Sequence, residues 1–361
     1  MKIATIVGAR PQFIKMAPVS KELRKHFEEV VIHTGQHYDY EMNRIFFEQL
    51  GIPEPDYYLG VGSGSHGYQT GEMLKRIEEV LIKEQPDIVL VYGDTNSTLA
   101  GALAAVKLHI KVAHVEAGLR SFDKGMPEEV NRVLTDHVSD YLFAPTETAV
   151  KNLHNEGIKE GVYLTGDVMY DALLHNIKIA RKRSSILSRL GLKPKGYLLA
   201  TVHRAENTDN MERLKTIIKA FIESDEMIVF PAHPRTRKYL EAYGLIGEVE
   251  KAGNVLLIPP VGYLDMLVLE ENARKILTDS GGVQKEAYFL KVPCVTLREK
   301  TEWVETVEDG WNVLVGADKE KILRVIKEFE PKGDTYMYKF GDGKASRRIA
   351  EIIRREMSGG V

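Results

Sequence analysis

The sequence predicts an α/β protein built from two Rossmann-like, doubly wound parallel-sheet domains. Its 361 residues exceed what one hydrophobic core usually serves. Short apolar runs alternate with longer helical patterns, which is typical of parallel strands covered on both faces by helices. The alternation stops near the middle of the chain and then begins again. We therefore expect domains at residues 1–168 and 169–361, with an interdomain cleft that holds a ligand.

Five apolar runs in the first half are candidate buried strands: Lys2–Val7, Glu29–His33, Asp87–Tyr92, Lys111–Val115 and Tyr141–Ala144. Four stretches between them have helical spacing: Pro11–Lys25, Gly71–Gln85, Thr95–Leu108 and Pro127–Val138. The last of these helices has an apolar face with Val130, Val133, Leu134, His137 and Val138. Its polar face carries Glu128, Asn131, Arg132 and Thr135.

The second half repeats this pattern, with candidate strands at Tyr197–Val202, Met227–Pro231, Val255–Ile258, Lys275–Thr278 and Val292–Leu297. Helices are expected between them at Asn210–Glu223, Tyr263–Glu271 and Val283–Leu290. The hinge is placed near Gly166–Asp171, followed by a helix rich in Lys and Arg that runs to Leu190. A last amphipathic helix, Ala345–Met357, is free to pack on its own domain or back on the first.

Composition excludes several classes of protein. Hydrophobic residues make up 43% and charged residues 28%, which is ordinary for a globular protein. The net charge of −3 favours neither nucleic acid nor membrane as a partner. No apolar run approaches the roughly 18 residues of a membrane span, so we expect a cytoplasmic protein. Cys294 is the only cysteine, which excludes an intramolecular disulfide, and its apolar surroundings predict a small buried hydrophobe.

Polar residues follow the strands of the first half, at the sheet edge where ligands of open parallel sheets bind. Gly8-Ala9-Arg10-Pro11 ends the first strand, and Lys15 lies one helical turn further on, an arrangement that favours an anion such as a diphosphate. Asp94 follows the third strand and Glu116 the fourth. Two carboxylates at neighbouring strand ends are costly unless they are used, so both are candidate acids or bases.

Glu128 is a third candidate carboxylate. It opens the helix Pro127–Val138, and the loop before that helix comes from the strand end that carries Glu116. A favourable charge in the first turn of a helix explains Glu128 equally well.

The second half supplies a phosphate site. The strand Tyr197–Val202 ends in His203-Arg204, and the strand Lys275–Thr278 ends in Asp279-Ser280-Gly281-Gly282 before a helix that carries Glu286. The glycines clear space and the first N–H groups of the helix point outward, so a pyrophosphate bound there meets His203 or Arg204.

Two other site types are not favoured. The segment Gly62–Gly67 matches G-x-G-x-x-G, but the loop-like stretch Pro53–Tyr58 precedes it where a dinucleotide fingerprint needs a strand. A loop before a helix is the better interpretation. No zinc signature is visible, and His114, inside an apolar strand, is interpreted as a satisfied core histidine.

Taken together, these motifs resemble the non-hydrolysing UDP-N-acetylglucosamine 2-epimerase family. The matching pieces occur in the family's order over nearly the whole chain: Gly8–Pro11 with Lys15, Gly93–Thr95, His114–Arg120, Pro127–Glu129 with Asn131-Arg132, His203-Arg204, and Thr278–Gly282 with Gln284 and Glu286. The resemblance implies a glycosyltransferase-B-like fold, a homodimer and no cofactor or metal. It also implies that UDP is held mainly by the second domain, with the sugar facing the first.

The resemblance also implies roles for single residues. Asp94, Glu116 and Glu128 look like the family's acid–base carboxylates, and His203 looks like its essential histidine near the diphosphate. Residues that look like substrate contacts are Arg10, Lys15, Ser280, Gly281, Gly282 and Glu286. The implied reaction interconverts UDP-N-acetylglucosamine and UDP-N-acetylmannosamine, by elimination of UDP to a 2-acetamidoglucal and re-addition.

The sequence departs from the family pattern in two places that concern the substrate. Members dedicated to UDP-N-acetylglucosamine often carry an arginine and a proline where this chain has Thr301–Glu305, and Gly8–Lys15 looks like the branch that acts on UDP-2,3-diacetamido-2,3-dideoxy-glucuronic acid. Gln36-His37-Tyr38 retains part of the site where a second substrate molecule activates bacterial members. The diacetamido uronate epimerase, a glycosyltransferase of the same fold and a nucleotide-sugar sensor therefore stay as alternatives.

Overall fold

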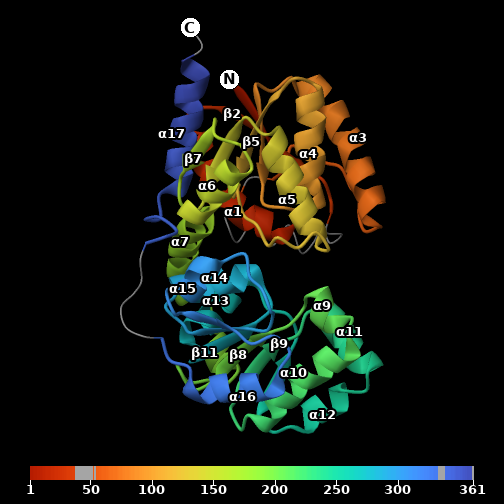
Figure 1. The fold of residues 1–361 in the computed structure, drawn as a ribbon, viewed down its shortest axis with the longest axis vertical. Helices are drawn as coiled ribbons and strands as arrows, with labels where there is room; N and C mark the ends of the chain where they lie inside the picture. Colours follow the sequence, from red (N-terminus) through yellow and green to blue (C-terminus); the bar gives the residue numbers. More distant parts are fainter. Residues whose placement is uncertain (37–51, 53, 332–337, 360–361) are drawn as a thin grey trace. The chain divides into compact units, whose positions relative to one another are not determined.

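A computed structural model describes residues 1–36, 52, 54–331 and 338–359 of the chain (Figure 1). The chain divides into two compact units, one made of Met1–Leu174 with Tyr338–Val361 and the other of His175–Met337. The boundary therefore falls inside a helix, α7 (Val168–Arg183), a few residues after the hinge expected from the sequence. The C-terminal segment belongs to the first unit.

The first unit is built on a seven-stranded sheet of order β3-β2-β1-β4-β5-β6-β7, in which every neighbouring pair is parallel. Its strands are β1 (Lys2–Val7), β2 (Glu28–His33), β3 (Tyr57–Tyr58), β4 (Ile88–Tyr92), β5 (Lys111–Val115), β6 (Tyr141–Ala144) and β7 (Val162–Leu164). The expectation of a loop over Pro53–Tyr58 was wrong at its end, because Tyr57 and Tyr58 pair with β2. Edge strands of two or three residues are too short to show a periodic pattern.

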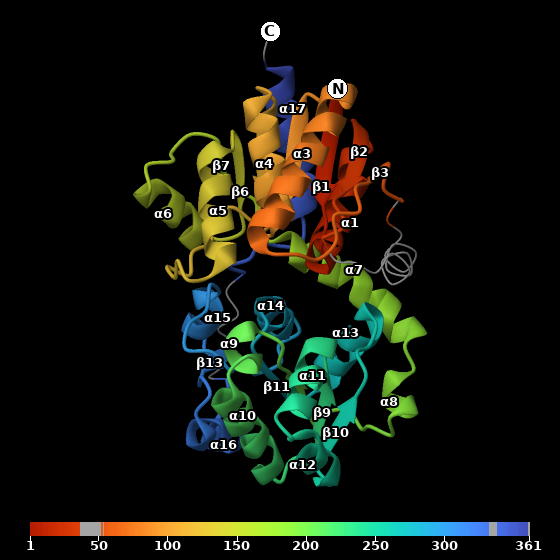
Figure 2. The same cartoon turned by 90° about the vertical axis from the view of Figure 1, so that its right-hand side faces the viewer.

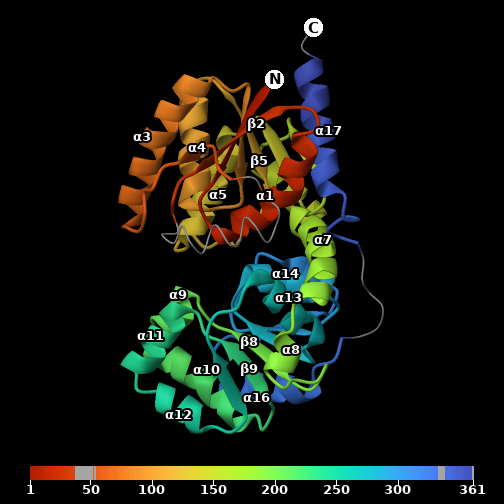
Figure 3. The ribbon, with the colours of Figure 1, turned by 180° about the vertical axis from the view of Figure 1, so that it is seen from behind.

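Helices cover both faces of this sheet: α1 (Arg10–Leu23), α3 (His66–Glu84), α4 (Asn96–Lys107), α5 (Pro127–Val138), α6 (Glu147–Asn155), the start of α7, and α17 (Ala345–Ser358). The helices α3, α4 and α5 form one layer, with α4 in the middle (Figures 1 and 2). On the other side α17 packs along α1, as Figure 3 shows from behind. Asp171 of α7 accepts hydrogen bonds from the N–H groups of Ala345 and Ser346 and so fixes the start of α17.

The second unit repeats the architecture with a six-stranded parallel sheet of order β10-β9-β8-β11-β12-β13. Its strands are β8 (Leu198–Thr201), β9 (Ile228–Pro231), β10 (Val255–Ile258), β11 (Lys275–Thr278), β12 (Cys294–Thr296) and β13 (Asn312–Leu314). Its helices are α8 (Ile186–Arg189), α9 (Ala205–Thr208), α10 (Met211–Glu223), α11 (Pro234–Ala242), α12 (Ile246–Lys251), α13 (Tyr263–Asn272), α14 (Gly281–Phe289), α15 (Val304–Glu308) and α16 (Lys319–Glu328). The fold class expected from the sequence, two parallel-sheet α/β domains, is confirmed.

One helix prediction in this unit was wrong. The helix rich in Lys and Arg ends at Arg183 instead of Leu190, and the short α8 follows. Ser184 explains the break, because its hydroxyl donates to Asp265 and accepts a hydrogen bond from the N–H of Ile186. A serine hydroxyl that bonds to nearby backbone competes with the helical hydrogen bonds.

In both sheets the order in which strands are added reverses near the centre, and this positions the candidate site. Each chain segment starts in the middle of its sheet, builds outward to one edge, and then crosses to the other side, between β1 and β4 in the first unit and between β8 and β11 in the second. In open parallel sheets, ligands bind beyond the carboxyl ends of the strands at such switch points. The loops after β1, β4, β8 and β11 are therefore the places to examine for chemistry. Within the described ranges, no helix is both long and apolar enough to cross a membrane.

Candidate active site

A cluster of opposite charges lies at the switch point of the first unit. Lys15, on α1, places its Nζ 2.7 Å from Oε1 of Glu116, and both side chains are nearly buried. Arg132, on α5, forms an ion pair with Asp94, which follows β4. Gly93, which precedes Asp94 in the chain, lies against the first pair, since a Cβ built on it would lie 3.1 Å from Lys15 Nζ and 3.9 Å from Glu116 Oε1. The structure therefore brings the two strand-end carboxylates together, as the sequence analysis expected.

The charges of this cluster control the protonation of Asp94. Burial works to raise the pKa of Asp94, as does the nearby charge of Glu116, but Arg132 and Lys15 outweigh both and hold that pKa below its ordinary value. Asp94 is therefore an anion at neutral pH. Because Lys15 pairs with Glu116 and Arg132 pairs with Asp94, cations within the site offset the repulsion that made these two like charges costly in the sequence analysis.

Glu116 has an unusual backbone. Its φ is +74°, in the left-handed region that a residue with a Cβ adopts only at a cost of about 1–3 kcal/mol. Such strain persists where the surrounding structure enforces it, and it is concentrated at functional sites. Here the left-handed turn directly follows β5 and directs the carboxylate to Lys15.

His114 supports the same loop from inside the sheet. It is fully buried on β5, with Nδ1 2.7 Å from Asp136 Oδ1 and Nε2 2.7 Å from the carbonyl oxygen of Gly93. The expectation of a satisfied core histidine is therefore confirmed. Its contact with Gly93 holds the residue next to Asp94 in place.

The helix α5 buries its polar side and exposes its apolar side, the reverse of a simple amphipathic helix. Its buried residues are polar: Glu129, Asn131, Arg132, Thr135 and Asp136. Val130 and Leu134, on the apolar face identified in the sequence, are 42% and 46% exposed. The polar side is buried because each of its charges has a partner within the unit, such as Asp94 for Arg132.

Glu128 and Glu129 are neighbours with different surroundings. Glu129 accepts hydrogen bonds from the N–H and hydroxyl of Ser121, from the N–H of Phe122 and from Arg132. These four donors make Glu129 an anchor for the loop before α5. Glu128 is partly exposed in the first turn of the helix, four residues before Arg132 and hence on the same side of it.

The loop after β1 differs from the anion site expected there. The N–H groups of Gly8 and Ala9 donate to Oε1 of Gln12, so they are engaged within the loop. Gly8 is needed for packing, because a Cβ on it would lie 2.0 Å from Thr34 Oγ1. Any anion at this loop would be held by side chains, Lys15 among them. The side chain of Arg10 lies outside the described part of the structure, as do His37 and Tyr38, while Gln36 accepts a hydrogen bond from Ser97.

Asp279 organises the switch point of the second unit. It is fully buried after β11 and accepts hydrogen bonds from the N–H groups of His203 and Arg204 and from Nδ2 of Asn207. These bonds tie the segment after β8 to the segment after β11. The polar residues that the sequence analysis expected to meet here are therefore adjacent.

The imidazole of His203 is half-exposed, with Nδ1 3.6 Å from Asp279 Oδ1 and its ring centroid 6.0 Å from that of His233. Its surroundings lower the pKa of His203 through desolvation, which Asp279 opposes and which Arg204 and Arg235 reinforce. His203 is therefore neutral at pH 7, so that one ring nitrogen donates and the other accepts a hydrogen bond.

The helix α14 begins at Gly281, two residues before the predicted start, with Ser280 as its N-cap. Its first N–H groups have no acceptor inside the helix and form a natural site for an anion. A side chain at Gly281 would displace its neighbours, because a Cβ would lie 2.7 Å from Oε1 of Glu302 and 3.1 Å from Nε1 of Trp303. Glu286 lies one turn after Gly282 and is nearly buried.

Comparison with known proteins gives the family. The model of the UDP-N-acetylglucosamine 2-epimerase family matches residues 21–354. The chain is 68% identical over 355 residues to a UDP-N-acetylglucosamine 2-epimerase homolog of Methanococcus maripaludis, covering 98% of this chain and 99% of the relative. It is 51% identical over 368 residues to the UDP-2,3-diacetamido-2,3-dideoxy-D-glucuronate 2-epimerase of Pseudomonas aeruginosa, with 98% and 100% covered.

A solved structure of an epimerase has the same fold as this chain. The UDP-GlcNAc 2-epimerase of Methanocaldococcus jannaschii, in complex with UDP-GlcNAc and UDP, superposes with a TM-score of 0.93 at 51% identity, covering 98% of this chain and 99% of that chain. The chain belongs to the UDP-N-acetylglucosamine 2-epimerase family. It is an epimerase. The epimerase prediction made from the sequence is therefore favoured over the glycosyltransferase and the nucleotide-sugar sensor.

Some contacts at this site could not be predicted from the sequence pattern. Asn131 was placed on a polar face, but its bonds to the carbonyl of Asp94 and to Asn96 join α5 to the start of α4. Asn96 also contacts Nδ1 of His66 at the start of α3. Only the placement of three helices in space brings these groups together.

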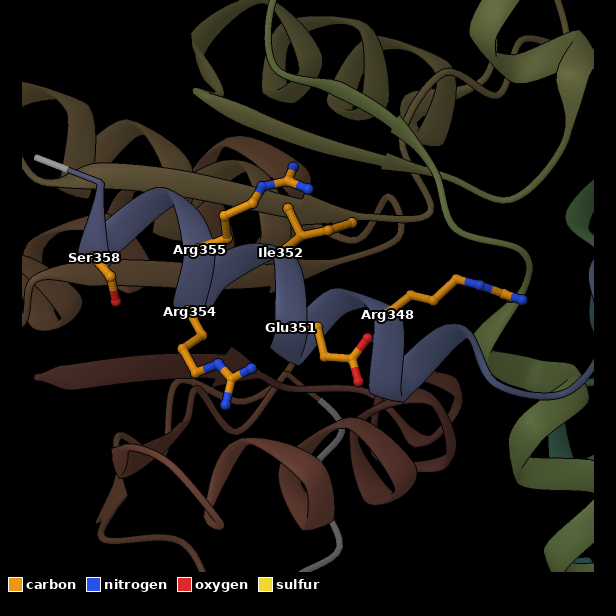
Figure 4. A pocket seen from close by; sticks show the side chains of 6 residues that line it. All are labelled: Arg348, Glu351, Ile352, Arg354, Arg355 and Ser358. Atoms are coloured by element: carbon orange, nitrogen blue, oxygen red, sulfur yellow. The ribbon is translucent and has the colours of Figure 1, made fainter.

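A separate hollow of about 530 Å³ lies on α17, away from the candidate residues (Figure 4). It is lined by Arg348, Glu351, Ile352, Arg354, Arg355 and Ser358. Two of its arginines have acidic partners, Arg348 with Asp342 and Arg355 with Glu356. The lining is that of a solvated charged helix, and we assign no chemistry to it.

Proposed function

We propose that this epimerase is non-hydrolysing and interconverts UDP-N-acetylglucosamine and UDP-N-acetylmannosamine. The observation that carries the proposal is the cluster of Asp94, Glu116, Lys15 and Arg132 at the first switch point. It supplies the anion of Asp94 and a second carboxyl group, that of Glu116, at a place where ligands of parallel sheets bind. Inversion at C2 of a sugar needs proton transfer, and positioned carboxylates provide it.

The proposed reaction proceeds by elimination. The bond between C1 and the diphosphate oxygen breaks, UDP leaves with the electron pair, and the positive charge that develops at C1 acidifies the C2 proton. A carboxylate takes that proton, which gives a 2-acetamidoglucal with a double bond between C1 and C2. Another of these groups, in its carboxylic acid form after taking a proton from water, then delivers that proton to the opposite face of C2 while UDP adds back to C1, and the first group returns its proton to water. We assign these roles jointly to Asp94, Glu116 and Glu128.

Glu129 is the rival to Glu128 in the same helical turn. Its four hydrogen-bond donors occupy its carboxylate oxygens and fix its position, so we propose that Glu129 is structural. Glu128, partly exposed at the start of α5, is better suited to exchange a proton with a substrate.

We propose that the second unit holds UDP. The first N–H groups of α14, after Ser280, would bind the diphosphate and stabilise it as it departs, with Gly281 and Gly282 giving it room. Neutral His203 would donate a hydrogen bond to the same group. Glu286 would accept hydrogen bonds from the sugar hydroxyls of the nucleotide, the role that carboxylates play for ribose in dinucleotide sites.

A second sugar is supported by a specific observation. The Pseudomonas aeruginosa relative that acts on a diacetamido glucuronate is as similar to this chain, at 51% identity, as the Methanocaldococcus jannaschii UDP-N-acetylglucosamine enzyme is. The purified protein should therefore be incubated with each UDP sugar in turn, and the products separated by ion-exchange chromatography. Turnover of UDP-N-acetylglucosamine alone or in clear preference supports the proposal, and turnover of the uronate alone contradicts it.

The catalytic assignment is tested by Asp94→Asn, Glu116→Gln and Glu128→Gln. Each should lower the rate at least about a thousandfold, since acid–base groups contribute about 10²–10⁴-fold each and here act in sequence. Each should keep UDP affinity within about tenfold, because UDP is bound by the other unit. Near-normal rates for two of the three variants would exclude the three-carboxylate assignment.

We further propose a homodimer, formed through the exposed apolar stripe of α5. Val130 and Leu134 are about half-exposed and lie four residues apart, so they form one stripe on the helix surface. Light scattering should give twice the chain mass of 40.7 kDa for the wild type. Val130→Asp with Leu134→Asp should give the single mass, and a wild-type monomer or an intact dimer of this variant would contradict the proposal.

A cytoplasmic location also remains a proposal. Its support is Cys294, a free and buried thiol in a chain with no second cysteine, a pattern typical of reducing compartments.

A further inference from the structure

One histidine near the candidate site of the first unit has no part in the reaction proposed above. His66 belongs to the G-x-G-x-x-G segment Gly62–Gly67 and is the first residue of α3. Its side chain is exposed. A helix that follows a parallel strand begins at the edge where that strand ends, so the start of α3 lies at the sheet edge that carries Asp94 and Glu116.

A chain of side-chain amides fixes the surroundings of His66. Nε2 of Gln69 donates to the carbonyl oxygen of Gly62 at 2.7 Å, which leaves Oε1 of Gln69 as an acceptor. Nδ2 of Asn96 donates to that Oε1 at 3.0 Å, and Oδ1 of Asn96 accepts a hydrogen bond from Nδ2 of Asn131 at 3.1 Å. The orientation of the Asn96 amide is therefore determined, because turning it over would place donor against donor and acceptor against acceptor.

The orientation of this amide determines which nitrogen of His66 carries the proton. Nδ2 of Asn96 lies 3.2 Å from Nδ1 of His66, and Oδ1 of the same amide lies 3.4 Å from it. Nδ2 has a second hydrogen to donate, whereas Oδ1 already accepts a hydrogen bond from Asn131. Nδ1 of His66 is therefore an acceptor, and Nε2 carries the proton of the neutral ring. Because the side chain is exposed, this N–H can donate to a ligand.

The same amides connect His66 to the proposed catalytic cluster. Nδ2 of Asn131 donates to the carbonyl oxygen of Asp94 at 3.0 Å as well as to Asn96. Asn96 itself follows Asp94 by two residues, at the start of α4. The Asp94 side chain is 27% exposed and so is open to a ligand as well. The donor of His66 is therefore held in a fixed position relative to Asp94.

The kind of donor indicates the kind of group that it binds. The cations of the cluster, Lys15 and Arg132, are paired with carboxylates, and the N–H of His66 adds a neutral donor beside them. A neutral oxygen acceptor on the sugar is the suitable partner for such a donor. In the proposed reaction Asp94 and Glu116 act at C2, and the substituent on C2 is an acetamido group with a carbonyl oxygen.

We propose that His66 is a substrate-binding residue whose Nε2–H donates a hydrogen bond to the carbonyl oxygen of the acetamido group at C2 of a UDP sugar. The proposal rests on the proposed function in taking C2 to lie beside Asp94 and Glu116. UDP-N-acetylglucosamine and the diacetamido uronate both carry this group at C2. His66 thereby selects sugars with an acetamido group at C2 over sugars with a hydroxyl there.

The test compares UDP-N-acetylglucosamine with UDP-glucose, which has a hydroxyl at C2, in calorimetric titrations of the full-length protein. All titrations use a Glu128→Gln parent, so that the bound sugar is not converted. His66→Phe keeps a planar ring without a donor and should weaken binding of UDP-N-acetylglucosamine about three- to tenfold, the range of a hydrogen bond between neutral groups. Binding of UDP-glucose and of UDP should change less than about twofold, because neither ligand carries the amide carbonyl.

Two further variants separate the hydrogen bond from other effects of the substitution. His66→Gln places an amide N–H near the position of Nε2 and should bind UDP-N-acetylglucosamine within about twofold of the parent. His154→Phe makes the same exchange at another exposed histidine, on α6, and should leave all three affinities unchanged.

Three results would overturn the proposal: parental affinity for UDP-N-acetylglucosamine in His66→Phe, an equal loss for UDP-N-acetylglucosamine and UDP-glucose, or a glutamine variant as weak as the phenylalanine variant. Turnover by the protein with His66 and Glu128 intact tests the proposed function separately. Absence of epimerisation with the expected binding pattern would reject the proposed function alone. Epimerisation of UDP-N-acetylglucosamine without that binding pattern would reject the role of His66 alone.

Discussion

The ion pair of Lys15 and Glu116 can be tested for its separate contributions to stability and activity. The two atoms lie 2.7 Å apart, and the side chains are only 11% and 6% exposed. Lys15→Met leaves a buried carboxylate without its partner, which typically costs about 3–5 kcal/mol of unfolding free energy. For a unit of this size, each kcal/mol lowers the melting midpoint by roughly 2–4 °C, so a shift of about 6–20 °C is expected.

Combining Lys15→Met with Glu116→Gln should recover most of that loss, because removing both charges leaves no unpaired ion. Urea unfolding of the wild type, the two single variants and the double variant gives the coupling free energy, which should be at least about 2 kcal/mol. The double variant should regain stability without regaining turnover, since both groups are lost from the site.

Lys25→Met is the matched control. Lys25 forms a similarly short pair with Glu22, 2.6 Å apart, but its side chain is 52% exposed. Solvent screens such a pair, so the change should cost less than about 1 kcal/mol. If Lys15→Met is no more destabilising than Lys25→Met, or if the double variant is as unstable as Lys15→Met, the description of a buried, mutually dependent pair is refuted.

Two further predictions concern the loop after β11 and the core of the first unit. Gly281→Ala should lower both stability and UDP affinity, because its Cβ would lie 2.7 Å from a carboxylate oxygen, whereas Gly282→Ala, with its closest neighbour at 3.8 Å, should melt like the wild type and lose only UDP affinity. Equal UDP affinity in all three proteins would exclude a diphosphate at this turn. Burial opposes ionisation of Asp136, but His114 and Arg120 hold the pKa of Asp136 below its ordinary value. The ionised side chain therefore adds to the free energy of unfolding above about pH 4, and this stabilisation is lost as the pH falls through the folded-state pKa. Asp136→Asn should therefore cost about 2–3 kcal/mol at pH 7 by urea unfolding, with the difference from the wild type shrinking below about pH 4; a difference that does not change with pH would contradict this assignment.

The fold was accessible from the sequence because its central strands are buried on both faces. Runs such as Lys111–Val115 and Lys275–Thr278 leave no other assignment, and the structure has them at those bounds. The pattern fails where burial does not follow hydrophobicity. On α5, a sequence pattern marks Val130 as core and Arg132 as surface, and the structure shows the reverse. The partner that makes Arg132 tolerable inside, Asp94, is 38 residues away in the chain.

The candidate site could also be predicted only in part from the sequence. Topology alone places Asp94 and Glu116 at neighbouring strand ends, because consecutive parallel strands end at one edge of the sheet. The cations that balance them come from two helices, and their identity depends on how those helices are rotated about their axes.

Proton exchange at C2 tests the central claim most directly. The purified protein would be incubated with UDP-N-acetylglucosamine in D2O without added cofactor and followed by proton NMR. Signals of UDP-N-acetylmannosamine should appear, with loss of the C2 proton signal from both epimers as deuterium replaces it. Formation of the second epimer with its C2 proton retained would contradict the elimination mechanism, and an unchanged spectrum would contradict the assignment of UDP-N-acetylglucosamine as the substrate.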